Sequence, residues 1–205
     1  MTIPDGDPKM VDAVDAARTG YAIDAGVSRF SVRASASGFL SSLGHNPTIA
    51  VRGFSGDVEC TPEVLADAAV SVRVDASQLA VEDNMSDRDQ REIERVMKEE
   101  VLETDRFSDI TFASTRVTVA PGAGGPPTAQ VTGRLSLHGV TRDITFTTHV
   151  VVMGTMLRAF GDFSLRQTDY GIRLVSVAAG GLKVKDEVGI SFDIVARKRG
   201  GPACV

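Results

Sequence analysis

Three histidines are the side chains of this sequence best suited to acid–base or metal chemistry, and they stand far apart at His45, His138 and His149. Zinc sites usually combine histidine and cysteine at short, characteristic spacings. The two cysteines, Cys60 and Cys204, form no C-x-x-C pair. We therefore expect no metal site and no disulfide framework, while a single bridge between the two cysteines stays open.

Each histidine also has an ordinary structural interpretation. His138 precedes Gly139, where the chain is expected to reverse between two strands, so its imidazole is predicted to bond to nearby backbone and fix the turn. His149 falls on the polar face of a predicted strand. His45 follows a short apolar segment, and it is a candidate to cap the polar end of a ligand.

The carboxylates show no catalytic arrangement. Asp87 and Asp89 open a predicted helix, where acidic side chains oppose the helix dipole. A catalytic carboxyl pair would need a cleft and a raised pKa. Arg166 and Asp169 are predicted to form an ion pair that holds a loop, with contact to a polar ligand head group as a second role for Arg166. We expect no catalytic residue and no enzyme.

The composition excludes two classes of partner. The chain has 205 residues and a net charge of -5, and no cluster of lysine and arginine offers a surface for nucleic acid. No run approaches the roughly 18 apolar residues that predict a membrane span. The first residues are acidic and contain no apolar leader, so the cytoplasm is the expected compartment.

Alternation of apolar and polar residues is the main structural signal. Between Val131 and Val152 it predicts two antiparallel strands joined near Gly139. Ile49–Cys60 is predicted to form one bent strand or two, with a bulge. Ser86–Glu103 instead repeats apolar residues at steps of three and four, which predicts an amphipathic helix with Ser86 as its N-cap.

Strands in this number commonly close on themselves, because closure removes exposed edges. We therefore predict an all-β domain with one substantial α-helix, built as an antiparallel barrel of about eight strands. The expected organisation is a flexible arm at 1–19, the barrel domain at 20–198 and a tail at 199–205. The interior of such a barrel is either filled by side chains or wide enough for one small ligand.

Several motifs resemble those of the YceI-like family, whose lipocalin-like members bind polyisoprenoids. The strongest is LSLHGVTRDITF at 135–146, similar to the family's L-x-x-H-G-V-T-K/R hairpin. GYAIDAGVSRFSV at 20–32 resembles its first hairpin, and LRQTDYGI at 165–172 resembles its R-x-D-F/Y-G stretch. The helix beginning MSDRDQ at Met85 and the ending KDEVGISFDI at 185–194 follow in the family's order. The resemblance spans about Gly20 to Lys198.

The resemblance implies a lipocalin-like barrel that binds, sequesters or transports a long apolar ligand, such as an isoprenoid, a quinone or a fatty acyl chain, without a cofactor. The interior and mouth residues expected to bind this ligand are Phe30, Val32, Phe39, Leu43, His45, Val72, Phe112, Leu135, Phe146, Phe163, Arg166 and Phe192.

Two other functions remain open at this point. A barrel filled by its own side chains would be a structural or interaction domain, and an enzyme would need polar titratable groups converging inside the barrel. A homodimer is kept as an open alternative for the assembly. A volume inside the barrel smaller than a lipid tail would favour the structural or interaction domain, and a larger one would favour a lipid carrier.

Overall fold

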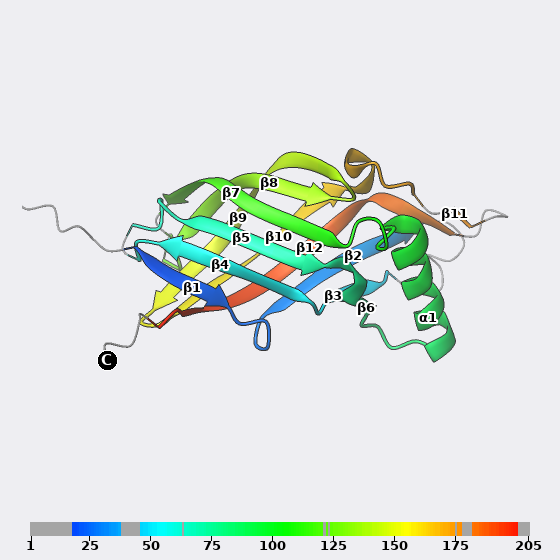
Figure 1. Cartoon of the computed structure of the whole chain (residues 1–205), viewed down its shortest axis with the longest axis horizontal. Helices are drawn as coiled ribbons and strands as arrows, with labels where there is room; N and C mark the ends of the chain where they lie inside the picture. The colour runs from blue at the N-terminus through cyan, green and yellow to red at the C-terminus, as the bar shows by residue number, and fades with distance from the viewer. Residues whose placement is uncertain are drawn as a thin grey trace, which may run out of the picture.

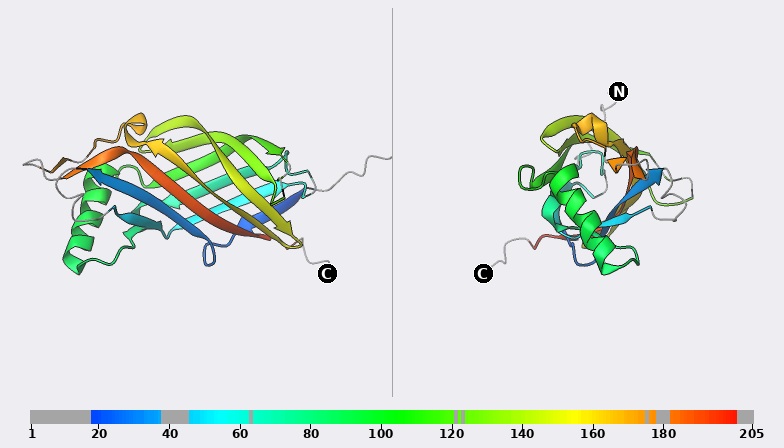
Figure 2. Two further views of the ribbon diagram at one scale, coloured as in Figure 1. Left: turned by 180° about the vertical axis from the view of Figure 1, so that it is seen from behind. Right: turned by 90° about the vertical axis from the view of Figure 1, so that its right-hand side faces the viewer.

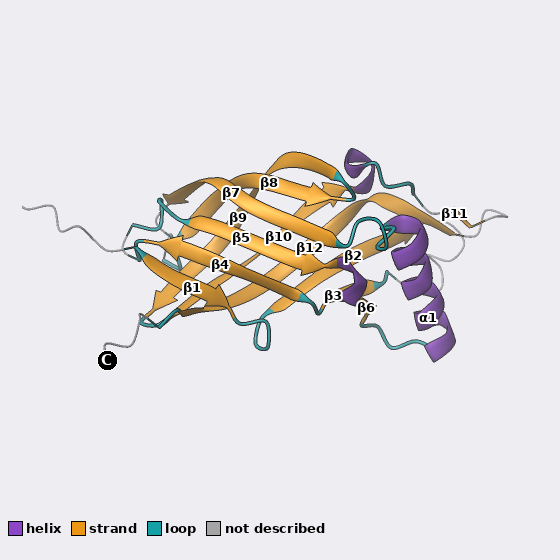
Figure 3. Cartoon of the chain, viewed as in Figure 1, coloured by secondary structure: helices purple, strands orange, loops and turns teal. Residues whose placement is uncertain are grey.

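The structure, a computed structural model, describes residues 18–37, 46–62, 64–120, 122, 124–174, 176–177 and 182–200. These ranges are mostly β-strand, with one α-helix that continues into a π-helical turn (Figure 1, Figure 3). In chain order the elements are β1 (Thr19–Ile23), β2 (Arg29–Ser37), β3 (Thr48–Val51), β4 (Phe54–Cys60), β5 (Ala69–Asp75), η2 (Ala76–Gln78), β6 (Leu79–Val81), α1 (Asp87–Val96), η3 (Met97–Val101), β7 (Asp109–Ala120), β8 (Thr128–Leu137), β9 (Val140–Met153), β10 (Met156–Arg166), η4 (Gln167–Tyr170), β11 (Ser176–Val177) and β12 (Leu182–Lys198).

The barrel closes through β1, which pairs with β4 on one side and with β12 on the other. The closed path β1–β4–β5–β7–β8–β9–β10–β12 contains eight antiparallel strands within the described part of the chain. β2, β3 and β6 extend the wall next to α1, because β2 pairs with β12 and β3 lies between β2 and β6. The predicted antiparallel barrel with one helix is confirmed.

Short interruptions divide the early strands. Ile49–Cys60 forms two strands, β3 and β4, separated at Arg52 and Gly53. A Cβ atom on Gly53 would lie 2.5 Å from Cδ of Gln78, so the break brings the chain close to the end of η2. β1 begins at Thr19, one residue before the predicted start of the barrel domain. The predicted domain limits remain predictions.

Alternation on β8 identifies the inner face of the barrel. Val131, Gly133 and Leu135 are buried, whereas the side chains between them are more exposed. Directly paired residues of neighbouring antiparallel strands lie on the same face. Phe112 is opposite Leu135 and Phe146 is opposite Val131, so both rings point inward.

The inner side chains form three buried clusters. The first, here called the distal cluster, comes from strand ends such as the end of β4, the start of β10 and the end of β12, which lie away from α1 (Figure 1, Figure 2). Its members are Tyr21, Val58, Cys60, Val117, Ala129, Val131, Val150, Leu157 and Ala196. The second, packed beside α1, contains Ile49, Val51, Val74, Leu79 and Val81, and the third contains Leu135, Leu137, Tyr170 and Ile172.

Helix α1 covers the edge strand at one end of the barrel. The Ser86 hydroxyl accepts a hydrogen bond from the Asp89 N–H at 3.2 Å, which confirms the predicted N-cap. The backbone of Val81 on β6 donates to Glu94 Oε1 at 2.9 Å and accepts from Gln90 Nε2 at 3.2 Å. The helix side chains thereby satisfy backbone groups that an uncovered sheet edge would leave exposed.

The predicted helical segment continues to Val101, but its regular α-helical part is shorter than predicted. Regular α-helix ends at Val96, and Met97–Val101 forms the π turn η3, in which Leu102 N–H donates to the Met97 carbonyl at 2.9 Å. Ile93 and Met97 pack against the cluster beside α1, as their predicted apolar spacing requires.

The turn between β8 and β9 consists of His138 and Gly139, with φ values of 51° and 75°. Two consecutive positive φ values are typical of a type I′ hairpin turn. The prediction that His138 bonds to its own turn is wrong. Its Nδ1 lies 3.3 Å from the Tyr170 carbonyl, and its Nε2 lies 3.3 Å from a carboxylate oxygen of Glu103. With the Phe107 ring at 4.4 Å, the imidazole connects the turn to more distant segments.

Gly139→Ala should destabilise the protein more than Gly154→Ala, as measured by chemical denaturation. Both glycines have positive φ, for which a non-glycine residue costs about 1–2 kcal/mol. Only the Gly139 change also meets a neighbour, because its Cβ would lie 2.7 Å from Phe107 Cε1, whereas nothing lies within 4 Å at Gly154. Overpacking of this kind costs about 1–3 kcal/mol more. Equal losses for the two variants would contradict the described packing of Phe107.

Candidate functional site

Four phenylalanine rings from four different strands meet inside the barrel. Phe146 on β9 is central: its ring centroid lies 5.6 Å from that of Phe112, 4.9 Å from that of Phe163 and 5.7 Å from that of Phe192. Phe163 and Phe192 are 6.3 Å apart. These separations are those of favourable aromatic pairs. The four predicted residues Phe112, Phe146, Phe163 and Phe192 therefore form one surface, here called the aromatic wall.

The aromatic wall is only half-buried, although its rings face inward. In the distal cluster, by contrast, Cys60 and Ala196 are 0% exposed and Leu157 is 3% exposed. A close-packed interior would exclude a water-sized sphere from both regions. The aromatic wall is therefore less closely packed than the distal cluster, against which Phe112 and Phe146 also pack. Phe112 and Phe192 are also among the residues that line two hollows open to solvent.

Four other predicted residues lie near the aromatic wall or border the neighbouring clusters. Phe30, opposite Phe192 across the β2–β12 pairing, packs edge to face against Phe54 at 6.0 Å. Val32 and Val72 pack against the cluster beside α1. Leu135 is 8% exposed and belongs to the third cluster, so it contributes mainly to packing.

The remaining predicted residues are not brought to the aromatic wall. Phe39, Leu43 and His45 lie outside the described residues. Arg166 is exposed at the end of β10 and forms an ion pair at 3.3 Å with Asp186, in place of the predicted pair with Asp169.

Sequence reasoning missed several small or polar residues on the inner face. On β10 the inward positions Ala159 and Gly161 carry almost no side chain. Gly161 is directly opposite Phe192. Thr148 on β9 is 4% exposed, and its hydroxyl donates to the Phe160 carbonyl at 3.1 Å. Their only sequence signal is the two-residue period that places them in phase with the phenylalanines.

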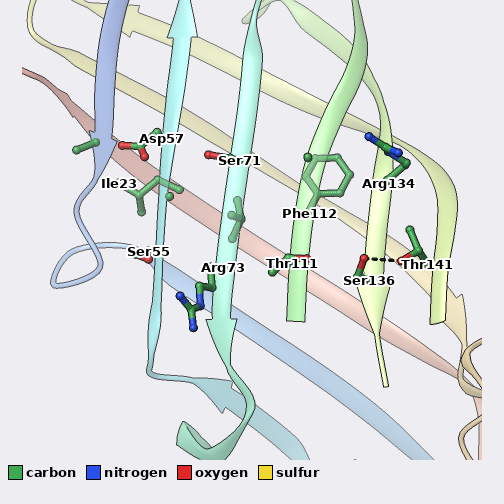
Figure 4. A pocket seen from close by; sticks show the side chains of 14 residues that line it. Ile23, Ser55, Asp57, Ser71, Arg73, Thr111, Phe112, Arg134, Ser136 and Thr141 are labelled. Carbon is green, nitrogen blue, oxygen red and sulfur yellow. Dashed lines mark hydrogen bonds between the residues drawn. The ribbon is translucent and has the colours of Figure 1, made fainter. Parts of the chain in front are cut away.

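A hollow that is open to solvent, with a volume of about 690 Å³, extends along the barrel wall from β1 across β4, β5, β7 and β8 to the start of β9, and Val72 and Phe112 contribute to its lining (Figure 4). The Arg73 guanidinium in it donates to both carboxylate oxygens of Asp109, at 2.8 and 3.0 Å. Hydroxyl groups line much of the remainder: Ser55, Ser71, Thr111, Ser136 and Thr141. This outer hollow lacks the enclosed apolar surface that a lipid tail needs.

Two aspartates, Asp193 on the outer wall and Asp67 in a turn, have pKa values below the ordinary value. Burial instead raises the pKa of Tyr170, which lies in the third cluster. The Arg158 guanidinium bonds to both oxygens of Asp193, at 2.7 and 2.6 Å, and lowers the pKa of that carboxyl. Hydrogen bonds from the backbone and hydroxyl of Thr61 lower the pKa of Asp67. A carboxyl that donates a proton in catalysis needs a raised pKa. The two aspartate shifts stabilise charge and do not prepare an acid catalyst.

No helix in the described ranges is both long and apolar enough to cross a bilayer. Among the same residues, no three histidine, cysteine, aspartate or glutamate side chains gather as a metal site would require.

A family model for the YceI-like domain matches residues 21–196 of this chain. The chain belongs to the YceI-like family. Two UPF0312 proteins, from Vibrio parahaemolyticus and Vibrio campbellii, are each 36% identical to it over 101 residues. Each match covers 49% of this chain and 48% of the relative, so the chain spans about half the length of the curated relatives it matches.

Solved structures share the barrel. BcnA of Burkholderia cenocepacia has a TM-score of 0.65 and 21% identity, covering 84% of this chain and 98% of its own. A polyisoprenoid-binding domain from Saccharophagus degradans, implicated in plant cell wall breakdown, has a TM-score of 0.62 and 14% identity, covering 88% and 99%. The YceI protein of Campylobacter jejuni has a TM-score of 0.55 and 9% identity, covering 75% and 85%. At these identities the likeness establishes the YceI-like barrel fold.

Acid should destabilise this YceI-like barrel in part through Asp193. Its folded pKa lies below the ordinary value of 3.8, so its contribution to stability is present above that pH and is lost as the pH falls through the lowered value. The free energy of unfolding, measured by denaturation from neutral pH to below pH 3.8, should fall less for Asp193→Asn than for the unchanged protein. Because the pair is solvent-exposed, the difference at neutral pH should stay below about 1 kcal/mol.

Arg158→Gln is the matched control for this experiment, since it removes the other half of the same pair. Replacing both residues should reduce the pH dependence of the free energy of unfolding no further than replacing either one alone. Additive effects of the two substitutions would show that the carboxylate owes its stabilisation to other groups.

Proposed function

We propose that this protein binds a long apolar molecule inside the barrel and sequesters or carries it. Isoprenoids, quinones and fatty acyl chains share the required chemistry, an extended tail without charge. The observation that carries the proposal is the half-buried aromatic wall, because four rings from four strands form one apolar surface that faces the barrel interior. Ligand sites of this kind are concave and lined mainly by apolar and aromatic side chains.

The family gives independent support. The Saccharophagus degradans domain that shares this fold is described as binding polyisoprenoid. The present chain has the same overall barrel and places phenylalanine on four of its inner strand faces. Binding of a tail requires no catalytic group, and we propose a binding role in place of an enzymatic one.

The free energy gained by burying each methylene group explains why the tail must be long. Each methylene removed from water contributes about 0.8 kcal/mol. Micromolar affinity corresponds to about −8 kcal/mol, and association also costs translational, rotational and conformational entropy. A tail of more than about ten carbons is therefore needed to reach micromolar binding through burial alone.

An interaction domain with a filled barrel is the alternative. Such a domain would bury its inner side chains along the whole axis, as the distal cluster does. The exposure of the aromatic wall favours the ligand-binding proposal over this one.

Phe163→Ala should weaken binding of a fatty acid probe by about tenfold, because it removes one ring from the aromatic wall. Phe160→Ala is the matched control. Phe160 lies three residues earlier on β10, faces outward and stacks on His149 at 5.2 Å, so its removal should leave binding unchanged. Isothermal calorimetry on delipidated protein measures both, with circular dichroism to verify folding.

Two results would count against the proposal. If Phe163→Ala and Phe160→Ala weakened binding equally, the ligand would not be bound at the aromatic wall. A protein that carries no lipid after purification, as judged by organic extraction and mass spectrometry, and that also binds no added probe, would favour the filled barrel.

A further inference from the structure

The wall of the barrel is only partly paired between β9 and β10, two strands that the structure describes in full. Their pairing runs from the connecting turn to the point where Phe160 lies opposite His149. Beyond this point, Gly161–Arg166 of β10 pairs with β12 alone, and Val140–Thr148 of β9 pairs with β8 alone. These two facing stretches, here called the seam, therefore lack the backbone ladder that joins each of them to its other neighbour.

The strands touch where the pairing ends. The Thr148 hydroxyl donates to the Phe160 carbonyl at 3.1 Å, so a side chain occupies this carbonyl at the last pair. A Cβ atom on Gly161 would lie 2.8 Å from the Thr147 carbonyl oxygen, which is closer than a side chain tolerates. The two backbones therefore approach each other at Gly161 without forming a further ladder pair.

Apolar side chains close the seam on its inner side. The rings of Phe146 on β9 and Phe163 on β10 stack across it, with centroids 4.9 Å apart and planes 18° apart. Farther along, Ile144 and Leu165 pack against the third cluster, which contains Tyr170. An aromatic pair contributes about 0.5–1.5 kcal/mol beyond its buried area. Opening the wall here breaks such side-chain contacts and no ladder of backbone hydrogen bonds.

A hollow of about 510 Å³, open to solvent, lies where the seam begins. Its lining comes from both sides of the seam and from β12: Thr147, His149, Phe160, Gly161, Asp162, Ser191, Phe192 and Asp193. Asp162 is exposed and lies opposite Ser191, whereas Phe192 belongs to the aromatic wall. The hollow therefore borders both the outer face of the barrel and a residue of the aromatic wall.

We propose that the barrel opens laterally at the seam, by separation of Phe146 from Phe163, and that the apolar tail enters and leaves by this route. The inference rests on the proposed function and adds to it the path of the ligand. The tail meets the hollow first and then Phe192 and the stacked rings. A route of this kind sets the rates of binding and release, while the affinity depends only on the free and bound states.

A disulfide across the seam tests the proposal. If the pairing of Phe160 with His149 continued by two residues, Asp162 would lie opposite Thr147, and both residues line the hollow. The pair Thr147→Cys and Asp162→Cys, in a chain that also carries Cys204→Ser, should hold the seam closed when oxidised.

Stopped-flow measurements with delipidated protein and a fluorescent fatty acid compare the oxidised and reduced forms of this variant. Oxidation should slow association and dissociation alike by at least about tenfold, because both pass through the same opening. The Kd should change by less than about twofold, since the seam is closed in the free and in the bound protein. Reduction of the disulfide should restore both rates.

The pair Thr132→Cys and Thr145→Cys, again with Cys204→Ser, is the matched control. Thr132 on β8 and Thr145 on β9 are directly paired, and their hydroxyl oxygens lie 2.9 Å apart. A disulfide here bridges strands that a ladder already joins, so oxidation should leave both rates unchanged.

The outcomes separate this inference from the proposed function. No binding by the unchanged protein overturns both. Unchanged rates with the seam disulfide formed, or equal slowing by the seam and control disulfides, overturn the lateral route and leave the proposed function standing.

A second bridge covers the case in which the first disulfide does not form or its variant does not fold. Thr145→Cys and Ser164→Cys lie two residues farther along the seam, and a bismaleimide joins their thiols without the strict geometry of a disulfide. This bridge should slow both rates in the same way, and rates that it leaves unchanged overturn the lateral route.

Discussion

The pairing of β1 with β12 is the constraint on which the rest of the structure depends. It joins the first strand of the described chain to the last and leaves the eight-stranded path without a free edge. Once the sheet is closed, the two-residue period of every strand sends one set of side chains into a common interior. The separate pairing of β2 with β12 makes Phe30 and Phe192, which are distant in sequence, direct neighbours.

Closure does not decide how well the interior is filled, and this barrel is filled unevenly. The distal cluster combines Tyr21 with small and branched aliphatic side chains and is almost fully buried. Farther along, flat rings face glycine and alanine, and the rings remain half-buried. Gly133 illustrates the geometry: an added Cβ would lie 2.5 Å from Phe112 Cζ, so the ring rests against the bare backbone of β8.

Much of the fold follows from local sequence signals, because alternation and helix capping are local properties. The period of β8 and the Ser86 cap were predictable for this reason, and the phase of the strands placed Phe112, Phe146, Phe163 and Phe192 on one interior surface. The limits appear where a contact joins distant segments. The imidazole of His138 meets Tyr170 and Glu103, and Arg166 meets Asp186, and neither pairing has a local signature. The decrease in side-chain size from Leu157 to Ala159 on β10 can be related to the barrel interior only once the neighbouring strands are in place.

The central claim is that apolar space adjoins the aromatic wall inside the closed barrel, and a crystal structure of delipidated protein under xenon pressure tests it most directly. Xenon occupies apolar cavities that are large enough and dry. The account predicts xenon beside Phe146 and Phe163, on the side that faces Ala159 and Gly161. Rings interlocked along the barrel axis, with no xenon among them, would contradict it.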